Sequence, residues 1–132
     1  MSVETATRTV RKRKEPGQRM MNETELMTGI IRAAESLGYL VFHPTISQFS
    51  KPGYPDLTIC GYGRYWQWEC KGPKGIVSAK QQEWIDQLQE SGVDARVVWP
   101  GDYDDVIKEL QRGYEDGRRW ESPSFAAKET PR

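Results

Sequence analysis

The sequence predicts an α/β fold in which helices flank a mixed β-sheet. Two observations carry this prediction. Residues 57–60 and 65–71 have the composition of strands, and the Gly61-Tyr62-Gly63-Arg64 segment between them has the composition of a turn, so we expect a β-hairpin. A helix-like segment and a further strand follow it, which makes a βαβ unit whose two strands should run parallel.

The first element is predicted to be an amphipathic helix. Asn22 is a favourable N-cap, Glu25 lies three residues later as in a capping box, and Gly38 is a stop signal. The apolar face of this helix consists of Leu26, Met27, Ile30, Ile31, Ala34 and Leu37. Residues 39–43 form the first predicted strand, and residues 44–55 form a long loop.

Two further helices and a strand are predicted after the hairpin. Gly72-Pro73-Lys74-Gly75 interrupts the chain, and Ser78 caps a helix that ends at Gly92. This helix should pack through Trp84, Ile85 and Leu88. Residues 95–99 form the last predicted strand, and Asp102 caps a final helix that contains Val106, Ile107 and Leu110.

Charge is unevenly distributed along the 132 residues, although the formal net charge is zero. Residues 1–20 hold six basic and two acidic side chains, which leaves 13 basic and 17 acidic side chains in the remainder. We expect residues 1–21 to form a flexible basic arm, residues 22–112 the folded domain, and residues 113–132 a loosely held charged tail. The arm either binds nucleic-acid phosphates or serves only solubility, and the candidate contacts are Arg11, Lys12, Arg13 and Lys14.

The composition excludes several classes of protein. Two cysteines are too few for a disulfide framework, and no His/Cys cluster has the spacing of a zinc site. No apolar run approaches the ~20 residues that span a bilayer, and the N-terminus lacks the apolar segment of a signal peptide. We therefore expect a soluble, intracellular protein of the cytoplasm with no membrane partner.

Two acidic side chains should face each other at the open end of the hairpin. If the hairpin closes symmetrically about its turn, Cys60 pairs with Tyr65, and counting outward places Asp56 opposite Glu69. Opposed residues of antiparallel strands have Cβ atoms ~5 Å apart, and like charges there destabilise the sheet. A divalent cation between the carboxylates would turn that repulsion into a binding site. Lys71, two residues beyond Glu69, projects from the same face.

Alternation along the hairpin separates an apolar face from a polar face. The apolar face, which should pack on helices, holds Leu57, Ile59, Trp66, Trp68 and Cys70. The polar face holds Asp56, Thr58, Cys60, Tyr65, Gln67, Glu69 and Lys71. The alternative to a metal site is an ordinary hairpin whose polar face meets solvent and whose acid pair is incidental.

A third acidic residue lies at the start of the first helix. Glu23 precedes the apolar stripe by three and four residues, so it can point toward the sheet. Glu25 is rotated about 200° from Glu23 and has a sufficient role in the capping box. The alternative for Glu23 is a favourable acidic residue near the positive end of the helix dipole.

Four features between Asn22 and Leu110 occur in the order and spacing of a known family. They are the acidic residue that opens the first helix and the segments SKPGYPDLTI, WECKGPKGIVSAKQQEW and GVDARVVWP. Together they resemble the VRR-NUC family of the PD-(D/E)xK nucleases. The resemblance implies a restriction-endonuclease-like α-β-β-β-α-β core, a divalent metal ion and phosphodiester hydrolysis.

The resemblance also implies roles for individual residues. Glu23 corresponds to the acid of the first helix, and Asp56 to the acid of the Pro-Asp motif. Glu69 and Lys71 correspond to the second acid and the lysine, which would position the attacking water or stabilise the transition state. The implied ligands of Mg²⁺ or Mn²⁺ are Glu23, Asp56, Glu69 and the backbone carbonyl of Cys70.

Gln81 matches the glutamine that opens the helix after the lysine, which implies a catalytic role. Residues 78–81 also form a capping box, which would explain Gln81 without catalysis. Two residues depart from the family pattern: Cys70 stands where an aliphatic residue is usual, and Gln48 stands where an arginine is common. Further candidates for contact with nucleic acid are His43, Lys51, Lys74 and Lys80, although surface lysines usually indicate only solvation.

These observations predict a metal-dependent endonuclease that hydrolyses DNA. Selectivity for junctions, flaps or nicks is expected because the chain has no base-reading helix and no separate recognition domain. The alternatives are a catalytically silent nucleic-acid-binding module with the same fold and a small-molecule phosphohydrolase. A homodimer is expected from function alone, because an enzyme that cuts both arms of a junction works best with two-fold symmetry.

Overall fold

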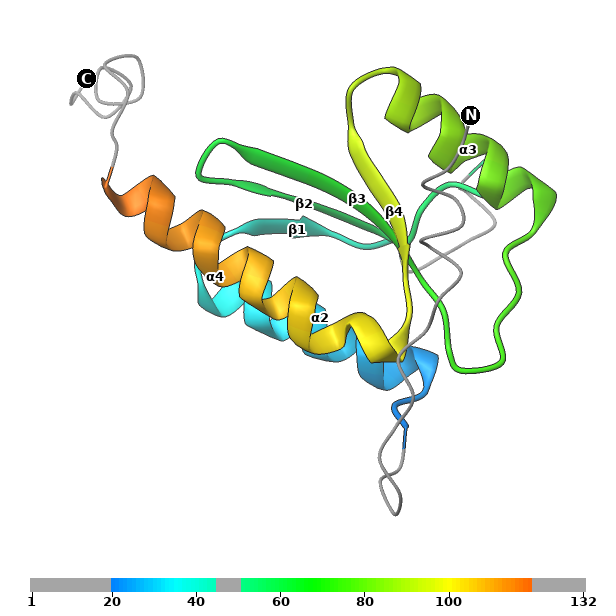
Figure 1. Ribbon diagram of the computed structural model, residues 1–132, viewed down its shortest axis with the longest axis horizontal. Helices are drawn as coiled ribbons and strands as arrows, with labels where there is room; N and C mark the ends of the chain where they lie inside the picture. Colours follow the sequence, from blue (N-terminus) through cyan, green and yellow to red (C-terminus); the bar gives the residue numbers. More distant parts are fainter. Residues whose placement is uncertain (1–19, 45–50, 120–132) are drawn as a thin grey trace.

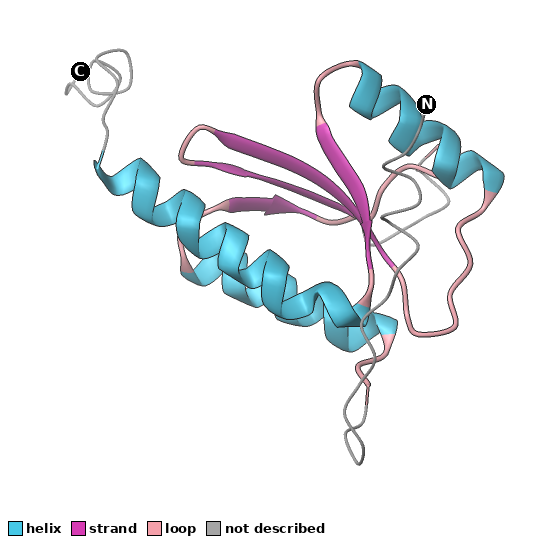
Figure 2. Ribbon diagram, viewed as in Figure 1, coloured by secondary structure: helices cyan, strands magenta, loops and turns pink. Residues whose placement is uncertain are grey.

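The computed structural model of the protein describes residues 20–44 and 51–119, and it has a four-stranded mixed sheet with helices on both faces (Figures 1 and 2). Arg11 to Lys14 and Gln48 lie outside the described residues. The sheet order follows the chain: β1 (Leu40–Phe42), β2 (Leu57–Gly61), β3 (Arg64–Cys70) and β4 (Asp94–Val98). The predicted α/β class and the mixed sheet are confirmed.

The helices form two layers around the sheet. They are α2 (Glu23–Ser36), α3 (Ala79–Glu90) and α4 (Tyr103–Arg119), with a short 3₁₀-helix, η2 (Pro100–Asp102), before the last. Figure 1 shows α2 and α4 side by side on one face of the sheet, and α3 on the other side beside β4. This gives the order α-β-β-β-α-β followed by α4.

The hairpin has the predicted register. β2 and β3 run antiparallel, with Cys60 opposite Tyr65 and Gly61 opposite Arg64. The turn residues Tyr62 and Gly63 have φ angles of 53° and 75°, as a two-residue turn that matches the strand twist requires. β1 pairs antiparallel with β2, and β4 pairs parallel with β3 through the α3 crossover. The predicted βαβ unit is therefore present.

Capping fixes the start of α2 as the sequence predicted. The Asn22 side chain accepts a hydrogen bond from the Glu25 amide at 2.8 Å, and the Glu25 carboxylate accepts one from the Asn22 amide at 3.0 Å. The helix ends before Gly38, whose φ of 96° suits glycine. Both ends of this helix are thus determined locally.

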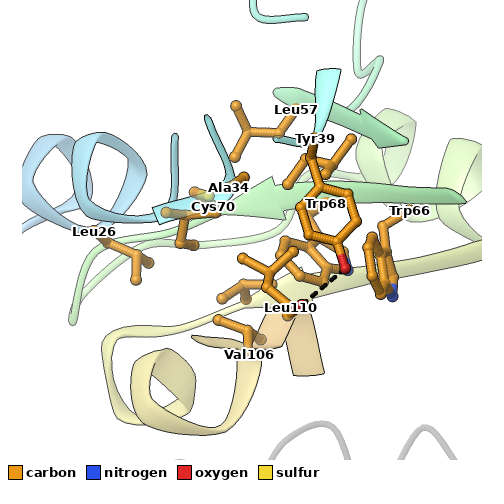
Figure 3. Close-up of a cluster of buried hydrophobic side chains, with 12 residues drawn as sticks. Leu26, Ala34, Tyr39, Leu57, Trp66, Trp68, Cys70, Val106 and Leu110 are labelled. Atoms are coloured by element: carbon orange, nitrogen blue, oxygen red, sulfur yellow. Dashed lines mark hydrogen bonds between the residues drawn. The ribbon is translucent and has the colours of Figure 1, made fainter. Parts of the chain in front are cut away.

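The main hydrophobic core lies between the sheet and the α2–α4 layer (Figure 3). Leu26 of α2, Trp68 of β3 and Leu110 of α4 have no exposed surface. Tyr39 closes the core at one side and donates a buried 2.8 Å hydrogen bond to the Leu110 carbonyl. Burial raises the pKa of Tyr39 to about 12. The apolar hairpin face therefore packs on helices, as predicted.

A smaller core lies between α3 and the opposite face of β4. It consists of Ile85, Ala95, Val97 and Trp99, with Val77, Leu88 and Val93 packed around them. Trp84, which we expected to pack with Ile85, instead lies over the turn at residues 51–54. Its Nε1 donates to the Pro52 carbonyl at 3.2 Å, and its ring meets Tyr54 edge-on at a centroid distance of 4.9 Å. The apolar side chains of α3 therefore contact two partners, the smaller core and the turn at residues 51–54, whereas the sequence indicated a single packing face.

The last helix continues past the point at which we expected the fold to end. α4 runs to Arg119, whereas the sequence predicted loose structure beyond Gly113. The Tyr114 ring lies 5.4 Å from the Tyr62 ring, and Asp116 forms a 3.0 Å ion pair with Arg64. The tip of the hairpin therefore holds this helical segment in place. The contact joins residues that lie too far apart in the chain for a local sequence pattern to predict it.

Truncation after Gly113 tests this contact. The free energy of unfolding of a chain of residues 1–113 should be about 2 kcal/mol lower than that of a chain of residues 1–119. The shorter chain loses an aromatic pair and the packing of Tyr62. Urea unfolding of both chains measures the difference. Equal free energies of unfolding would show that the hairpin tip does not stabilise α4.

Candidate active site

The hairpin register brings Asp56 and Glu69 together. Asp56 immediately precedes β2, Glu69 is the penultimate residue of β3, and Leu57 lies opposite Trp68 in the register between them. The Asp56 Oδ2 accepts a 2.9 Å hydrogen bond from the backbone amide of Cys70. The carboxylate of Asp56 is therefore held across the open end of the hairpin, as the sequence predicted.

Glu69 is buried, with only 3% of its surface exposed. Its Oε2 accepts a 2.9 Å hydrogen bond from Nε2 of Gln81 and lies 3.6 Å from Nζ of Lys71. Its Oε1 is also buried but has no hydrogen-bond partner in the described part of the chain. An unpartnered buried carboxylate oxygen is costly, so this atom is the strongest local indication that the site binds something.

The environment of Glu69 favours its protonated form. Burial, followed by the charge of Asp56, raises the pKa of Glu69 to about 8, and the charge of Lys71 opposes the shift. The contact with the Asp56 side chain and the charge of Glu23 make smaller contributions in the same direction as burial. The protonated form of Glu69 is therefore favoured when no cation lies between the two carboxyl groups.

Gln81 performs two tasks at once. Its Oε1 accepts from the Ser78 amide at 2.9 Å while its own backbone amide donates to the Ser78 hydroxyl at 3.1 Å, which completes the capping box of α3. Its Nε2 donates to Glu69. Because the capping contact requires the oxygen and the carboxylate requires the nitrogen, both contacts agree on the orientation of the side-chain amide. The capping interpretation and the functional interpretation are therefore compatible.

The N-terminus of α2 reaches the same end of the sheet. A Cβ atom added to Gly72 would lie 3.2 Å from the backbone nitrogen of Glu23, so only a glycine fits comfortably between Lys71 and the helix. Glu23 itself is exposed, and its charge acts on Glu69 and on Cys70. Glu25 has the capping role that the sequence predicted for it, which separates its role from that of Glu23.

The fit of a divalent cation can be tested on these atoms. In residues 20–44 and 51–119, no three His, Cys, Asp or Glu side chains lie close enough together to hold a metal ion, so Glu23 does not complete a three-side-chain cluster with the acid pair. The opposed carboxylates and the unpartnered oxygen of Glu69 do suit a hard cation. The Cys70 thiol lies in the core and burial raises its pKa, which leaves its backbone carbonyl as the other oxygen donor at this position.

The turn at residues 51–54 is packed against α3, a contact that the sequence did not predict. Gly53 has a φ of 85°, and a Cβ atom there would lie 2.6 Å from the backbone carbon of Lys80. The Tyr54 hydroxyl accepts a 3.1 Å hydrogen bond from Gln67, which is 1% exposed. Pro52-Gly53 was a visible turn signal, but nothing in it indicates the helix that it contacts.

The remaining candidates lie on segments that adjoin the site residues in the chain or contact them. His43 has its Nδ1 3.3 Å from the backbone carbonyl of Asp56, a contact suited to positioning that segment. Lys51 and Lys80 line an open groove of about 470 Å³ between the turn and α3, and Lys80 pairs with Glu83 at 3.4 Å. Lys74 is exposed on the loop after Lys71. These lysines remain predicted phosphate contacts.

The fold and this site together define an α/β domain with two opposed acids, one of them buried, and a lysine and a glutamine at one end of the sheet. The profile of the family described as "VRR-NUC domain" matches residues 18–99, and the chain belongs to this family. It is a nuclease family, and the predicted resemblance is confirmed. No curated protein matches the chain.

Two solved structures share the fold. One, titled "VRR_NUC domain protein", is 24% identical, covers 74% of this chain and 91% of its own, and has a TM-score of 0.52. The other, titled "VRR_NUC domain", is 21% identical, covers 68% of this chain and 94% of its own, and has a TM-score of 0.53. No helix in the two described stretches has the length and apolar character needed to cross a lipid bilayer.

The raised pKa of Glu69 predicts how stability depends on pH without metal. The folded protein keeps a proton that the unfolded chain releases above its ordinary value of 4.5, so stability should fall as the pH rises toward about 8. Glu69→Gln should remove this loss, because the introduced amide can donate to Asp56 at any pH. The variant should exceed wild type by about 2–4 kcal/mol near pH 8 and match it near pH 4.5.

Urea unfolding in EDTA at several pH values measures this difference. Glu83→Gln is the control, since this acid lies on the exposed side of α3 and should leave the pH dependence unchanged. A constant difference between wild type and Glu69→Gln across the pH range would mean that the pKa of Glu69 is the same in the folded and unfolded chains.

Proposed function

We propose that the protein is a metal-dependent endonuclease that hydrolyses DNA phosphodiester bonds and selects its substrates by structure. The observation that supports this most directly is the opposed Asp56–Glu69 pair, in which Glu69 is buried, has an unpartnered oxygen and lies beside Lys71 and Gln81. A fold without a reaction to perform gains nothing from this arrangement, because two opposed acids, one of them buried, destabilise it.

The chain supplies the oxygen ligands for Mg²⁺ or Mn²⁺. Asp56, Glu69 and the backbone carbonyl of Cys70 would hold the ion, and Glu23 would add negative charge from the start of α2. When bound, the ion lowers the pKa of a coordinated water and stabilises charge on the scissile phosphate.

The other residues of the site position these groups and balance their charge. Lys71 carries a compact positive charge 3.6 Å from Glu69, where it can orient the attacking water or stabilise the phosphate in the transition state. Gln81 fixes the rotamer of Glu69 through its hydrogen bond to Oε2. Both side chains therefore keep the Oε1 atom of Glu69 available for a ligand.

Selection by structure is proposed because the described part of the domain offers no element that could read bases. Each of its long helices is engaged on the sheet: α2 and α4 form the main core, and α3 forms the smaller one. Phosphate contacts from Lys51, Lys74 and Lys80 would carry no sequence information. Junctions, flaps and nicks are therefore the expected substrates, and a homodimer would present two sites to such a junction.

Cleavage assays with two variants test the catalytic assignment. Asp56→Asn and Glu69→Gln should each abolish cleavage of branched, nicked and duplex DNA in Mg²⁺ or Mn²⁺, and EDTA should abolish it in wild type. Lys71→Ala should lower the rate by about 10²–10³, the scale for loss of one transition-state donor. Asp86→Asn, on the exposed side of α3, is the control and should cleave normally.

Each rival function predicts a different result in this assay. A silent binding module would bind DNA without cleaving it in either metal. A small-molecule phosphohydrolase would release phosphate from a phosphomonoester and leave all DNA forms intact. Cleavage that persists in Asp56→Asn would contradict the assigned site.

Glu23 and Glu25 should separate in the same assay. Glu23→Gln removes a charge that acts on Glu69, so it should lower the metal affinity and the cleavage rate by about tenfold or more. Glu25→Gln keeps a side-chain oxygen that can reach the Asn22 amide, so its activity should stay within a few-fold of wild type. Titration with Mn²⁺ measures both effects, and a reversed order would place Glu25 at the site instead.

A further inference from the structure

The loop between Lys71 and α3 carries the most exposed large apolar side chain of the described residues. Ile76 has 82% of its surface exposed, whereas the next residue, Val77, packs against the smaller core. Single exposed apolar side chains are common and need no explanation by themselves. Ile76 is of interest because of its position on the loop that packs against Lys71, the proposed catalytic lysine.

Both ends of this loop are fixed, one to Lys71 and the other to α3 and the smaller core. A Cβ atom added to Gly75 would lie 3.0 Å from Cδ and 3.1 Å from Cβ of Lys71, so the backbone of Gly75 packs directly on the lysine side chain. The Gly75 amide also donates to the Gly72 carbonyl at 3.1 Å, which closes a turn. On the other side, Val77 is packed and Ser78 caps α3. Ile76 thus projects from a loop whose conformation is fixed by packing at both ends.

This geometry sets the reach of Ile76. Consecutive Cα atoms are ~3.8 Å apart, so Ile76 begins one residue from the atoms that contact Lys71 and its side chain ends within roughly 10 Å of them. Each nucleotide of a strand adds about 3.4 Å along the duplex axis. A phosphate held at Lys71 would therefore place Ile76 against the sugars and bases two or three nucleotides away.

We propose that Ile76 is an apolar wedge that inserts into the DNA base stack beside the scissile phosphate. Isoleucine is one of the side chains that architectural proteins insert between base steps, at a cost in unstacking. That cost is smallest where stacking is already interrupted. The preferred substrate is then DNA with a nick or branch within two or three nucleotides of the cleaved bond. This inference rests on the proposed function and deepens it.

Lys74 supports the assignment from the same loop. It lies two residues before Ile76 and is exposed, so the loop offers a cation for a neighbouring phosphate together with an apolar side chain for the bases. Leu40 provides the contrast, because it is 73% exposed on the edge strand β1 at the far side of β2. It therefore serves as a matched control for exposure alone.

Two measurements on the full chain test the wedge. The first is the ratio of cleavage rates on nicked and continuous duplex. Ile76→Ser should lower this ratio by roughly tenfold, the scale of burying part of an isoleucine side chain, whereas Ile76→Leu and Leu40→Ser should preserve it. The second uses 2-aminopurine next to the nick in a Glu69→Gln background. Binding should raise its fluorescence, and adding Ile76→Ser should remove the rise.

The outcomes separate this inference from the proposed function. Absence of cleavage by wild type would overturn the nuclease, but the fluorescence readout needs only binding. No fluorescence rise, or a rise that survives Ile76→Ser, would overturn the wedge. An equal loss of rate on nicked and continuous DNA would also overturn it. So would a change in self-association of Ile76→Ser with the ratio unchanged, since Ile76 would then serve a contact between copies of the chain.

Discussion

The opposition of two carboxylates at the open end of the hairpin, one of them buried, is the constraint on which the rest of the site depends. Asp56 and Glu69 are brought together by the register of β2 and β3, and that register also directs the apolar residues of both strands into the main core. A slip by one residue would expose the core face and separate the acids. The stability of the fold and the geometry of the site therefore rest on the same pairing.

Two backbone contacts assemble the site around this pair. Gly53 packs against the first turn of α3, which joins the segment that leads to Asp56 with the helix that carries Gln81. Gly72 packs against the start of α2, which brings the charge of Glu23 to the end of β3. A Cβ atom would clash with the α3 backbone at Gly53 and would press closely on the α2 backbone at Gly72. The site is consequently built from several chain segments but depends on very few direct side-chain bonds between them.

The two ends of the sheet differ in how their side chains are packed and hydrogen-bonded. At the end with the acids, polar side chains are buried with incomplete hydrogen bonding, as the Oε1 atom of Glu69 shows. At the opposite end, Tyr62 packs on Tyr39 and Tyr114 and holds α4 to the hairpin turn. The end with the acids thus leaves a buried polar atom without a partner, because the requirements of a cation and a substrate conflict with complete internal hydrogen bonding.

The sequence by itself determined the elements, the hairpin register and the acid pair, because capping boxes, turn residues and strand alternation act over a few residues. Asn22 with Glu25, and the turn at Tyr62-Gly63, are examples of such local rules. Only the tertiary structure decided that Trp84 covers the 51–54 turn and that α4 continues to Arg119. Those features arise from contacts between residues far apart in the chain, which no local pattern specifies. The raised pKa of Glu69 belongs with them, since burial by surrounding elements is its largest cause.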